Sequence, residues 1–382
     1  MPRQIKPRLV ISTVGTSLLT NQIDSECEPD LASQLQENAN LTAQEINPGS
    51  KINNIIQDLK QRAEDKLKEA NTIEIRETSA ELNGIYGLYD DQLENGKLDH
   101  HVLITTDTAQ GKITAKIVDK FLRHKKISVE VYTPEKLSTA NTKDFNQGID
   151  NLLDWIHRRV EEEEKKYEIY FNLVGGFKAL QGCMNTMGMF YADKIIYVFE
   201  GATSNLITIP RLPITADYSR LKDHVSILAL LDAGAGLLPS KTENIPEAMI
   251  AEIDGKMTIS NWGQLIWNQC KNDFLSKDIQ EFPRIYYGDN FKEDYGRIST
   301  PKERVKLQQT LAKVSGLLEE SNGDTRDLVK SVSYSPYKGA KEKEIYHFYV
   351  GIHWRVSCKV SQGNLTLRYY GTHDYVEGKE TN

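Results

Sequence analysis

The sequence predicts a multi-domain protein that joins an N-terminal α/β domain, a middle helical segment and a C-terminal α+β domain. Three observations lead to this prediction. Strand-like and helical runs alternate over the first 215 residues, short helical runs follow, and one long helix with three strands begins after residue 278. A chain of 382 residues is long enough for two or three domains, each with its own core. We therefore place the domains at residues 1–215, 216–277 and 278–382.

The N-terminal domain is expected to contain a parallel sheet with helices on both faces. Strands and helices that alternate with short connections form such a sheet, and its ligands bind beyond the carboxyl ends of the strands. The expected strands are residues 8–14, 72–76, 101–105, 127–132, 167–174 and 195–199. The expected helices include residues 51–70, 111–122, 145–166 and 177–191.

The most informative stretch is residues 167–182, where a strand-like run breaks at Gly175-Gly176 directly into a helix. Unpaired N–H groups and the positive end of the helix dipole converge at such a start, and Lys178 adds a charge in the first turn. The spacing is neither that of a P-loop nor that of the GxGxxG fingerprint. We expect a phosphate or ribose site here, and the alternative is an ordinary turn with a solvated lysine.

Residues 216–274 are expected to form short helices with a small wing. The helical runs are LKDHVSILALLDAGAGLL, IPEAMIAEIDGKMTIS and NWGQLIWNQCKNDF. Gly255-Lys256 indicates a tight turn beside a short strand, and Trp262 begins the next helix. This order fits a winged helix-turn-helix. Because no helix here carries a dense Lys/Arg face, a structural connector or a dimer brace is at least as good an interpretation as a DNA reader.

The C-terminal domain is expected to begin with a helix over residues 299–318, with Ser299 or Thr300 as its cap and Pro301 at its first position. Strands follow at residues 344–350, 355–360 and 365–370, and residues 362–364 turn between the last two. These elements make a small α+β unit.

Composition and charge exclude several classes of protein. The chain is 39% hydrophobic and 26% charged, and no apolar run approaches the ~20 residues of a membrane span. The N-terminal apolar run is too short for a signal peptide, so we expect a cytoplasmic protein. The formal charge of −7 argues against a chain coated in nucleic acid, although 17 Lys and Arg stand against 15 Asp and Glu from Ser276 onward. The four cysteines are scattered, so we expect neither a metal nor a cofactor.

Four segments together resemble the CRISPR-associated Rossmann-fold sensor domain, CARF, of the branch that carries a winged helix. They are ISTVGTSLLTN near the start, Ser79-Ala80-Glu81, TTDTAQG around Asp107, and LVGGFK at residues 173–178. The resemblance covers roughly residues 5–275. It implies a Rossmann-like fold, a homodimer and a site for cyclic oligoadenylate, with cyclic tetra-adenylate suited to the two-fold axis. The ligand-binding residues that it implies are Gly15, Thr16, Ser17, Leu18, Ser79, Ala80, Glu81, Gly175, Gly176, Phe177 and Lys178.

Some CARF relatives also cleave the cyclic ligand slowly. They use a serine near the first turn and the lysine of the glycine turn, and Ser17 and Lys178 occupy the matching positions. Binding needs only hydrogen bonds and charge from these residues, whereas cleavage also needs in-line geometry. Ring cleavage therefore stays open as an additional activity or as the main one.

Residues 345–378 resemble the RelE superfamily of mRNA interferases. Their sequence is IYHFYVGIHWRVSCKVSQGNLTLRYYGTHDYVEG. The resemblance covers roughly residues 278–382. It implies a metal-independent endoribonuclease that cuts mRNA in the ribosomal A site, where the RNA's own 2′-hydroxyl attacks the adjacent phosphate and the protein supplies proton-transfer groups and cations. The catalytic candidates are Arg355, Arg368, His373, Tyr375, Lys338, Lys341 and Lys343. His347 and His353 are interpreted as surface or packing residues.

The whole arrangement resembles the CRISPR-associated mRNA interferase family of type III CRISPR defence. It predicts a homodimer in which cyclic tetra-adenylate activates a ribosome-dependent nuclease. Two alternatives remain: a ligand-responsive transcription regulator that reads DNA through the winged helix, and a ring nuclease with an inert C-terminal domain.

Overall fold

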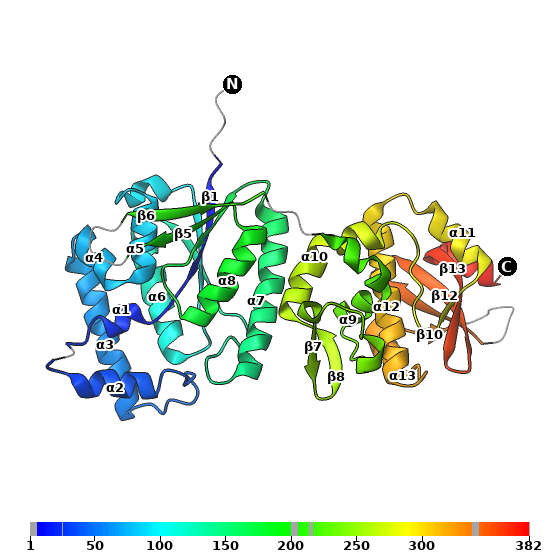
Figure 1. Ribbon diagram of the computed structural model, residues 1–382, viewed down its shortest axis with the longest axis horizontal. Helices are drawn as coiled ribbons and strands as arrows, with labels where there is room; N and C mark the ends of the chain where they lie inside the picture. The colour runs from blue at the N-terminus through cyan, green and yellow to red at the C-terminus, as the bar shows by residue number, and fades with distance from the viewer. Residues whose placement is uncertain (1–5, 25, 200–204, 214–216, 338–343, 382) are drawn as a thin grey trace, which may run out of the picture. The chain divides into compact units, whose positions relative to one another are not determined.

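The computed structural model describes residues 6–24, 26–199, 205–213, 217–337 and 344–381. The chain divides into two compact units, Met1–Ile214 and Thr215–Asn382, which we call the N-terminal and C-terminal units (Figure 1). Within the described ranges, none of the helices is long and apolar enough to cross a membrane.

The N-terminal unit is built on a six-stranded sheet with the order β3-β2-β1-β4-β5-β6. Strands β1 to β5 pair in parallel and β6 pairs antiparallel with β5, which confirms the predicted α/β architecture. The strands are β1 (Arg8–Thr13), β2 (His100–Ile104), β3 (Ser128–Tyr132), β4 (Glu168–Asn172), β5 (Lys194–Val198) and β6 (Leu206–Pro210). The helices are α1 (Ser17–Thr20), α2 (Pro29–Glu37), α3 (Lys51–Glu69), α4 (Thr72–Thr78), α5 (Ala80–Leu88), η1 (Leu93–Gly96), α6 (Ala109–His124), α7 (Thr142–Glu163) and α8 (Lys178–Tyr191).

Helices cover both faces of this sheet, with α6 on one side and α7 and α8 on the other (Figure 1). Strands with two covered faces read as continuous apolar runs rather than as alternating ones. Accordingly, β1, β2 and β4 are buried along nearly their whole length. The predicted strands at residues 8–14, 101–105, 127–132, 167–174 and 195–199 are thus confirmed to within two residues at each end.

The predicted strand at residues 72–76 is wrong, because these residues belong to helix α4. The side chain of Asn71 accepts hydrogen bonds from the N–H groups of Ile73 and Glu74, and the Glu74 side chain accepts from the N–H of Asn71. This capping box fixes a helix start. It outweighs the β-rich composition of so short a run.

The C-terminal unit contains a five-stranded sheet with the order β10-β11-β12-β13-β9 and a separate hairpin, β7-β8. Its strands are β7 (Ile250–Ile253), β8 (Lys256–Ile259), β9 (Ile285–Tyr287), β10 (Ser335–Pro336), β11 (Ile345–Val350), β12 (Trp354–Ser361) and β13 (Asn364–Thr372). Its helices are η2 (Tyr218–His224), α9 (Val225–Asp232), η3 (Pro239–Lys241), η4 (Glu247–Met249), α10 (Asn261–Leu275), α11 (Asp289–Arg297), α12 (Pro301–Glu320), α13 (Arg326–Val332) and α14 (His373–Thr381). As predicted, Thr300 occupies the cap position of α12 and Pro301 its first turn.

The predicted helix at residues 245–260 is wrong, whereas the predicted turn and strand are confirmed. Only Glu247–Met249 are helical, as a 3₁₀ turn, and the β7-β8 hairpin follows. Asp254 and Gly255 join its strands with φ of 51° and 77°. Positive φ at both central residues is the backbone of the tight hairpin turn that Asp-Gly favours.

One hydrophobic core runs through the C-terminal unit. It contains Leu228 of α9 and Trp267 of α10 together with Leu307 of α12 and Phe348 of β11. Residues from the middle segment and from the following α+β segment therefore bury their apolar side chains against one another.

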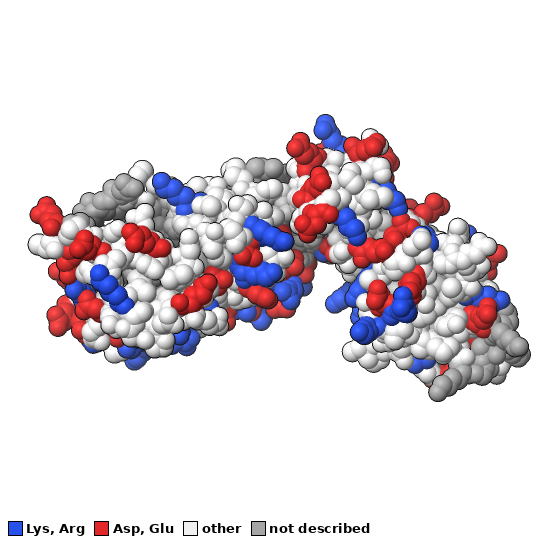
Figure 2. Space-filling view, turned by 90° about the horizontal axis from the view of Figure 1, so that it is seen from below, with Lys and Arg blue, Asp and Glu red and all other residues white. Residues whose placement is uncertain are grey.

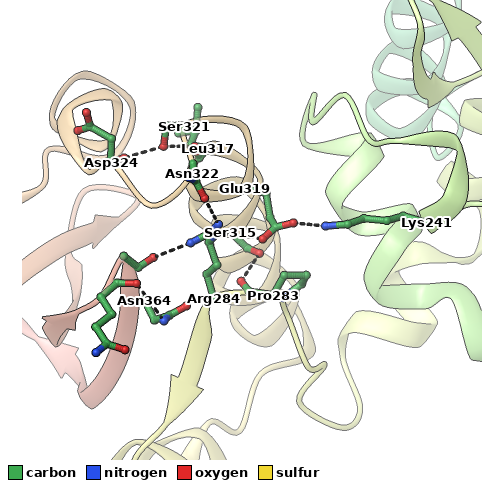
Figure 3. Close-up of polar contacts among 12 residues, drawn as sticks. Lys241, Pro283, Arg284, Ser315, Leu317, Glu319, Ser321, Asn322, Asp324 and Asn364 are labelled. Atoms are coloured by element: carbon green, nitrogen blue, oxygen red, sulfur yellow. Dashed lines mark hydrogen bonds and ion pairs between the residues drawn. The ribbon is translucent and has the colours of Figure 1, made fainter.

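A polar network on α12 adds to this packing (Figure 3). Glu319 accepts from the Nε of Arg284, at 2.9 Å, and from Lys241 of η3. Burial opposes the charged form of Glu319, but the two cations outweigh this effect and lower its pKa. Arg284 also donates to Asn322 Oδ1 at 2.7 Å, so one arginine ties β9, α12 and the loop after α12 together.

Candidate functional site

The strand order of the N-terminal sheet marks a ligand site. The chain runs outward from β1 through β2 to β3 and then returns to place β4 on the other side of β1. Ligands of open α/β sheets bind at this switch point, in the crevice outside the carboxyl ends of the strands. The turns after β1 and β4 carry Gly15 and Gly175-Gly176. Both predicted glycine turns therefore lie at the switch point.

The two turns touch through their backbones. A Cβ atom on Gly15 would lie 2.9 Å from the backbone nitrogen of Gly176, closer than side chains tolerate. Gly176 has φ of +94°, which favours glycine. The hydroxyl of Thr13 donates to the carbonyl of Gly175 at 2.5 Å. The glycines thus allow a contact between turns that are 160 residues apart in the sequence.

The segment Ser79–Glu81 joins the same contact. Glu81 is fully buried, and its carboxylate accepts from the N–H of Gly15 at 2.6 Å and from the hydroxyl of Ser79 at 2.7 Å. The N–H of Ala80 donates to the hydroxyl of Ser17 at 3.2 Å. Three of the predicted segments therefore meet around one buried carboxylate.

Two cavities open at this place, and we call them together the switch-point site. The first, of about 360 Å³, has polar and glycine lining that includes Gly15, Thr16, Ser17, Thr106, Thr108, Gly175 and Gly176. The second, of about 580 Å³, has polar lining that includes Ser17, Arg76, Asn83, Gln181 and Tyr197. Ser17, Ala80 and Val174 line both cavities, so the two cavities adjoin.

The other predicted ligand-binding residues differ in whether they line a cavity, lie buried beneath the site or are exposed at its border. Leu18 is fully buried in the hydrophobic core beneath the site, and Ser79 is also buried. Phe177 lines the first cavity. Lys178 is exposed at the first position of α8 and lines neither cavity. Ser79, Glu81 and Leu18 thus shape the site from below, and the exposed Lys178 directly follows Phe177 at the border of the site.

In the C-terminal unit, the candidate residues lie on two neighbouring strands and on the helix after them. Arg355 pairs with Tyr349 across β11 and β12, and His347 pairs with Ser357 two positions along. Alternate residues share one face of a sheet. The guanidinium of Arg355 lies 4.6 Å from the centre of the Tyr349 ring and donates to its hydroxyl. We call Tyr337, His347, Tyr349 and Arg355 the arginine cluster.

Arg368 forms an ion pair with a buried glutamate. Its Nε donates to Glu380 of α14 at 2.9 Å, and the Glu380 side chain is only 2% exposed. The hydroxyl of Ser357 donates to the same carboxylate oxygen at 2.6 Å. These contacts attach the C-terminal helix to the sheet.

His373 and Tyr375 begin α14 but point to different neighbours. His373 is exposed, with its Nδ1 3.0 Å from Asp374 Oδ1 and 3.2 Å from Glu377 Oε2. The hydroxyl of Tyr375 donates to buried Asp294 of α11 at 2.7 Å. Burial and this carboxylate raise the pKa of Tyr375. The predicted Lys338, Lys341 and Lys343 lie outside the described residues.

Residues 76–212 match the model of a CRISPR-associated protein family, Cas_APE2256. The match lies within the N-terminal unit and includes Ser79–Glu81 and the Gly175-Gly176 turn, but it begins after the Gly15 turn. It indicates a CRISPR-related role. None of the curated proteins that were compared matches the chain.

Sequence reasoning missed several residues of the switch-point site. Thr106 and Thr108 follow β2, whose carboxyl end lies beside that of β1. Both belong to the segment TTDTAQG, which contributed to the family resemblance, but they were not among the predicted ligand-binding residues. Arg76, Asn83 and Gln181 come from helices α4, α5 and α8. Only the folded arrangement brings these three together.

Replacing Arg368 by alanine is expected to destabilise the C-terminal unit by about 3 kcal/mol, because it leaves a buried carboxylate without its cation. Chemical denaturation measures this change. The double variant Arg368→Gln with Glu380→Gln removes both charges and should recover most of the stability. A variant Arg368→Ala that melts like the wild type would instead mean that the ion pair contributes little.

Proposed function

We propose that the protein is a cyclic tetra-adenylate-activated, ribosome-dependent endoribonuclease of type III CRISPR defence. The observation that carries the proposal is the meeting of Gly15, Ser79–Glu81 and Gly175-Gly176 at the switch point. The match to a CRISPR-associated family over residues 76–212 supports it, and so does the resemblance of the C-terminal segment to RelE.

The switch-point site has the chemistry that a cyclic oligoadenylate needs. Backbone N–H groups at the Gly175-Gly176 turn and the hydroxyls of Ser17, Thr106 and Thr108 suit phosphate and ribose oxygens. Arg76 and Gln181 add polar groups in the second cavity. In a homodimer, a two-fold symmetric ring would meet two copies of the same loops.

The nuclease step would use the RNA's 2′-hydroxyl as the nucleophile, which forms the new bond to phosphorus while the 5′-oxygen leaves. Arg355 then stabilises the charge that develops on the phosphorane oxygens. His373 is exposed and can exchange protons with the substrate. Ligand binding would activate cleavage only if the ligand prefers the nuclease-competent state of the dimer.

The surface supports a local rather than a global mode of RNA contact. On the face shown in Figure 2, basic and acidic side chains are interspersed instead of forming a field of one sign. Specific contacts at few residues, with the ribosome presenting the mRNA, agree with this distribution. The same distribution does not provide a continuous positive surface that would attract free RNA.

The test uses translating ribosomes with and without cyclic tetra-adenylate, followed by mapping of mRNA ends. We expect cuts in A-site codons only when the ligand is present. Cleavage at full rate without the ligand would remove the regulatory part of the proposal. Intact mRNA with the ligand bound would remove the nuclease part.

The alternative of a DNA-reading regulator receives little support from α10. Lys271 is the only Lys or Arg in this helix, and it is 3.7 Å from Asp232 and donates to Asn268 at 2.6 Å. Leu265, Trp267 and Cys270 of the same helix are buried. A helix with one engaged cation lacks the electrostatic footprint of a DNA reader.

Replacing Lys178 by alanine is expected to weaken cyclic tetra-adenylate binding about tenfold, because one charge-assisted contact at the start of α8 is lost. Calorimetry with the full chain measures the affinity. Lys165→Ala is the control. Lys165 is exposed and lies just before the amino end of β4, whereas the switch-point site lies at the carboxyl ends of the strands. Equal affinity of Lys178→Ala and wild type would reject the role of this lysine in binding and, with it, the Ser17–Lys178 mechanism of ring cleavage.

A further inference from the structure

The arginine cluster contains three buried polar atoms that have no hydrogen-bond partner among the described residues. They are the hydroxyl oxygen of Tyr337, Nδ1 of His347 and Nε of Arg355. Nearly all buried polar atoms in folded proteins have a partner, so a group of exceptions needs an explanation. An absent ligand is one such explanation.

The three side chains are in contact with one another or with Tyr349. The ring centres of Tyr337 and His347 are 4.4 Å apart, and those of His347 and Tyr349 are 5.8 Å apart. Arg355 joins this group by stacking on Tyr349. The three unpaired atoms therefore belong to one continuous patch on the sheet face formed by β10, β11 and β12.

All three groups can donate a hydrogen bond. His347 is 8% exposed, and burial, Arg355 and His373 lower its pKa to about 4, so the ring is neutral at neutral pH. Ser335 Oγ lies 3.4 Å from its Nε2. A hydroxyl that donates to Nε2 leaves the ring proton on Nδ1, where it is the third donor.

The described neighbours leave these donors without an acceptor. The cluster itself supplies a guanidinium, two phenols and a neutral imidazole. The carboxylates near Tyr337 are those of Glu377, which contacts His373, and of Glu380, which already accepts from Arg368 and Ser357. One cation with neutral donors around it suits an anion with several oxygens, which is the chemistry of a phosphodiester.

We propose that Tyr337 and His347 bind the scissile phosphate of RNA together with Arg355, and that Tyr349 positions Arg355 for this contact. This inference rests on the proposed nuclease function. It assigns phosphate-binding roles to two residues that would otherwise be interpreted as packing residues, and it places the reacting phosphate on the face opposite the apolar core. Tyr349 acts through its ring and hydroxyl on Arg355.

The first experiment measures anion binding without any nuclease assay. Inorganic phosphate is titrated into the full chain, and the imidazole nitrogen resonances of His347 are followed by NMR. We expect a saturable shift in the wild type that Arg355→Gln and Tyr337→Phe weaken at least tenfold, because each removes a donor to a charged group. A His347 signal that does not respond to phosphate would overturn the proposal.

The second experiment measures cleavage of ribosome-bound mRNA in the presence of cyclic tetra-adenylate. Tyr337→Phe and His347→Phe should each slow cleavage about tenfold to hundredfold, whereas His347→Asn, which keeps an N–H near the Nδ1 position, should retain more activity than His347→Phe. The matched control is Tyr334→Phe. Tyr334 is also buried with an unpaired hydroxyl, but it stacks on Tyr346 outside the cluster.

The two experiments separate this inference from the proposed function. Normal cleavage by both Tyr337→Phe and His347→Phe would overturn the inference while the nuclease function stands. If the wild type cuts no RNA, the proposed function fails, and the phosphate titration still decides whether the cluster binds anions. Equal losses in Tyr334→Phe and Tyr337→Phe would mean that a buried hydroxyl matters for folding alone, and this would also overturn the inference.

Discussion

Replacing Arg355 by alanine is expected to slow RNA cleavage by a factor of about 10²–10³, the usual effect of losing a group that stabilises transition-state charge. The structure holds this guanidinium against Tyr349 by stacking and by a hydrogen bond. Its position is therefore set before the substrate arrives. Arg355→Lys should recover little, because an ammonium lacks the planar fork of a guanidinium.

Single-turnover cleavage of ribosome-bound mRNA, with saturating cyclic tetra-adenylate, measures this effect. Arg326→Ala is the control for loss of one positive charge from the same unit, because the Arg326 side chain is 89% exposed. Its cleavage rate should equal that of the wild type. An Arg355→Ala variant that cuts at the wild-type rate would show that another cation carries the phosphorane charge.

Replacing Gly175 by alanine is expected to weaken cyclic tetra-adenylate binding by about 10²-fold or more, as calorimetry would measure. The new Cβ would lie 2.3 Å from Oε1 and 2.6 Å from Cδ of buried Glu81. The carboxylate has to move, and it then loses its bond to the N–H of Gly15. Overpacking of this kind also costs about 1–3 kcal/mol of stability.

The matched control for this prediction is Gly182→Ala, seven residues later in α8. A Cβ at Gly182 would meet no atom within 4 Å, and alanine in place of glycine stabilises a helix by about 0.5–1 kcal/mol. Ligand affinity should stay unchanged in this variant. If Gly175→Ala binds the ligand as well as Gly182→Ala does, the two glycine turns do not form the ligand site.

The sequence predicted most of the N-terminal sheet because a parallel strand buried on both faces leaves a dense apolar run. It failed at residues 72–76, where TIEI reads as a strand and the capping box of Asn71 and Glu74 decides for a helix. It also missed β6, Leu206–Pro210, whose residues are largely exposed. An edge strand of this kind lacks the buried run that identifies the others.

The glycine turns of the candidate site were predictable because their position after strands fixes where they lie in the sheet. The role of Arg368 was not predictable, because its partner Glu380 lies twelve residues later in helix α14 and the pair forms only when α14 packs on the sheet. Tyr337 and His347 were equally hidden. Their proposed role in phosphate binding rests on polar atoms that are buried without a hydrogen-bond partner among the described residues, and a sequence cannot show this.

The shared core of the C-terminal unit limits how this protein can be recombined with others. Leu228 and Trp267 pack in the same core as Leu307 and Phe348, so a chimaera cut between residues 277 and 278 would expose apolar surface on both fragments. A junction at Ile214 and Thr215, where the two compact units meet in sequence, keeps that core whole. Natural exchange of the N-terminal unit between such proteins would be under the same constraint, with the middle segment inherited together with the α+β segment that follows it.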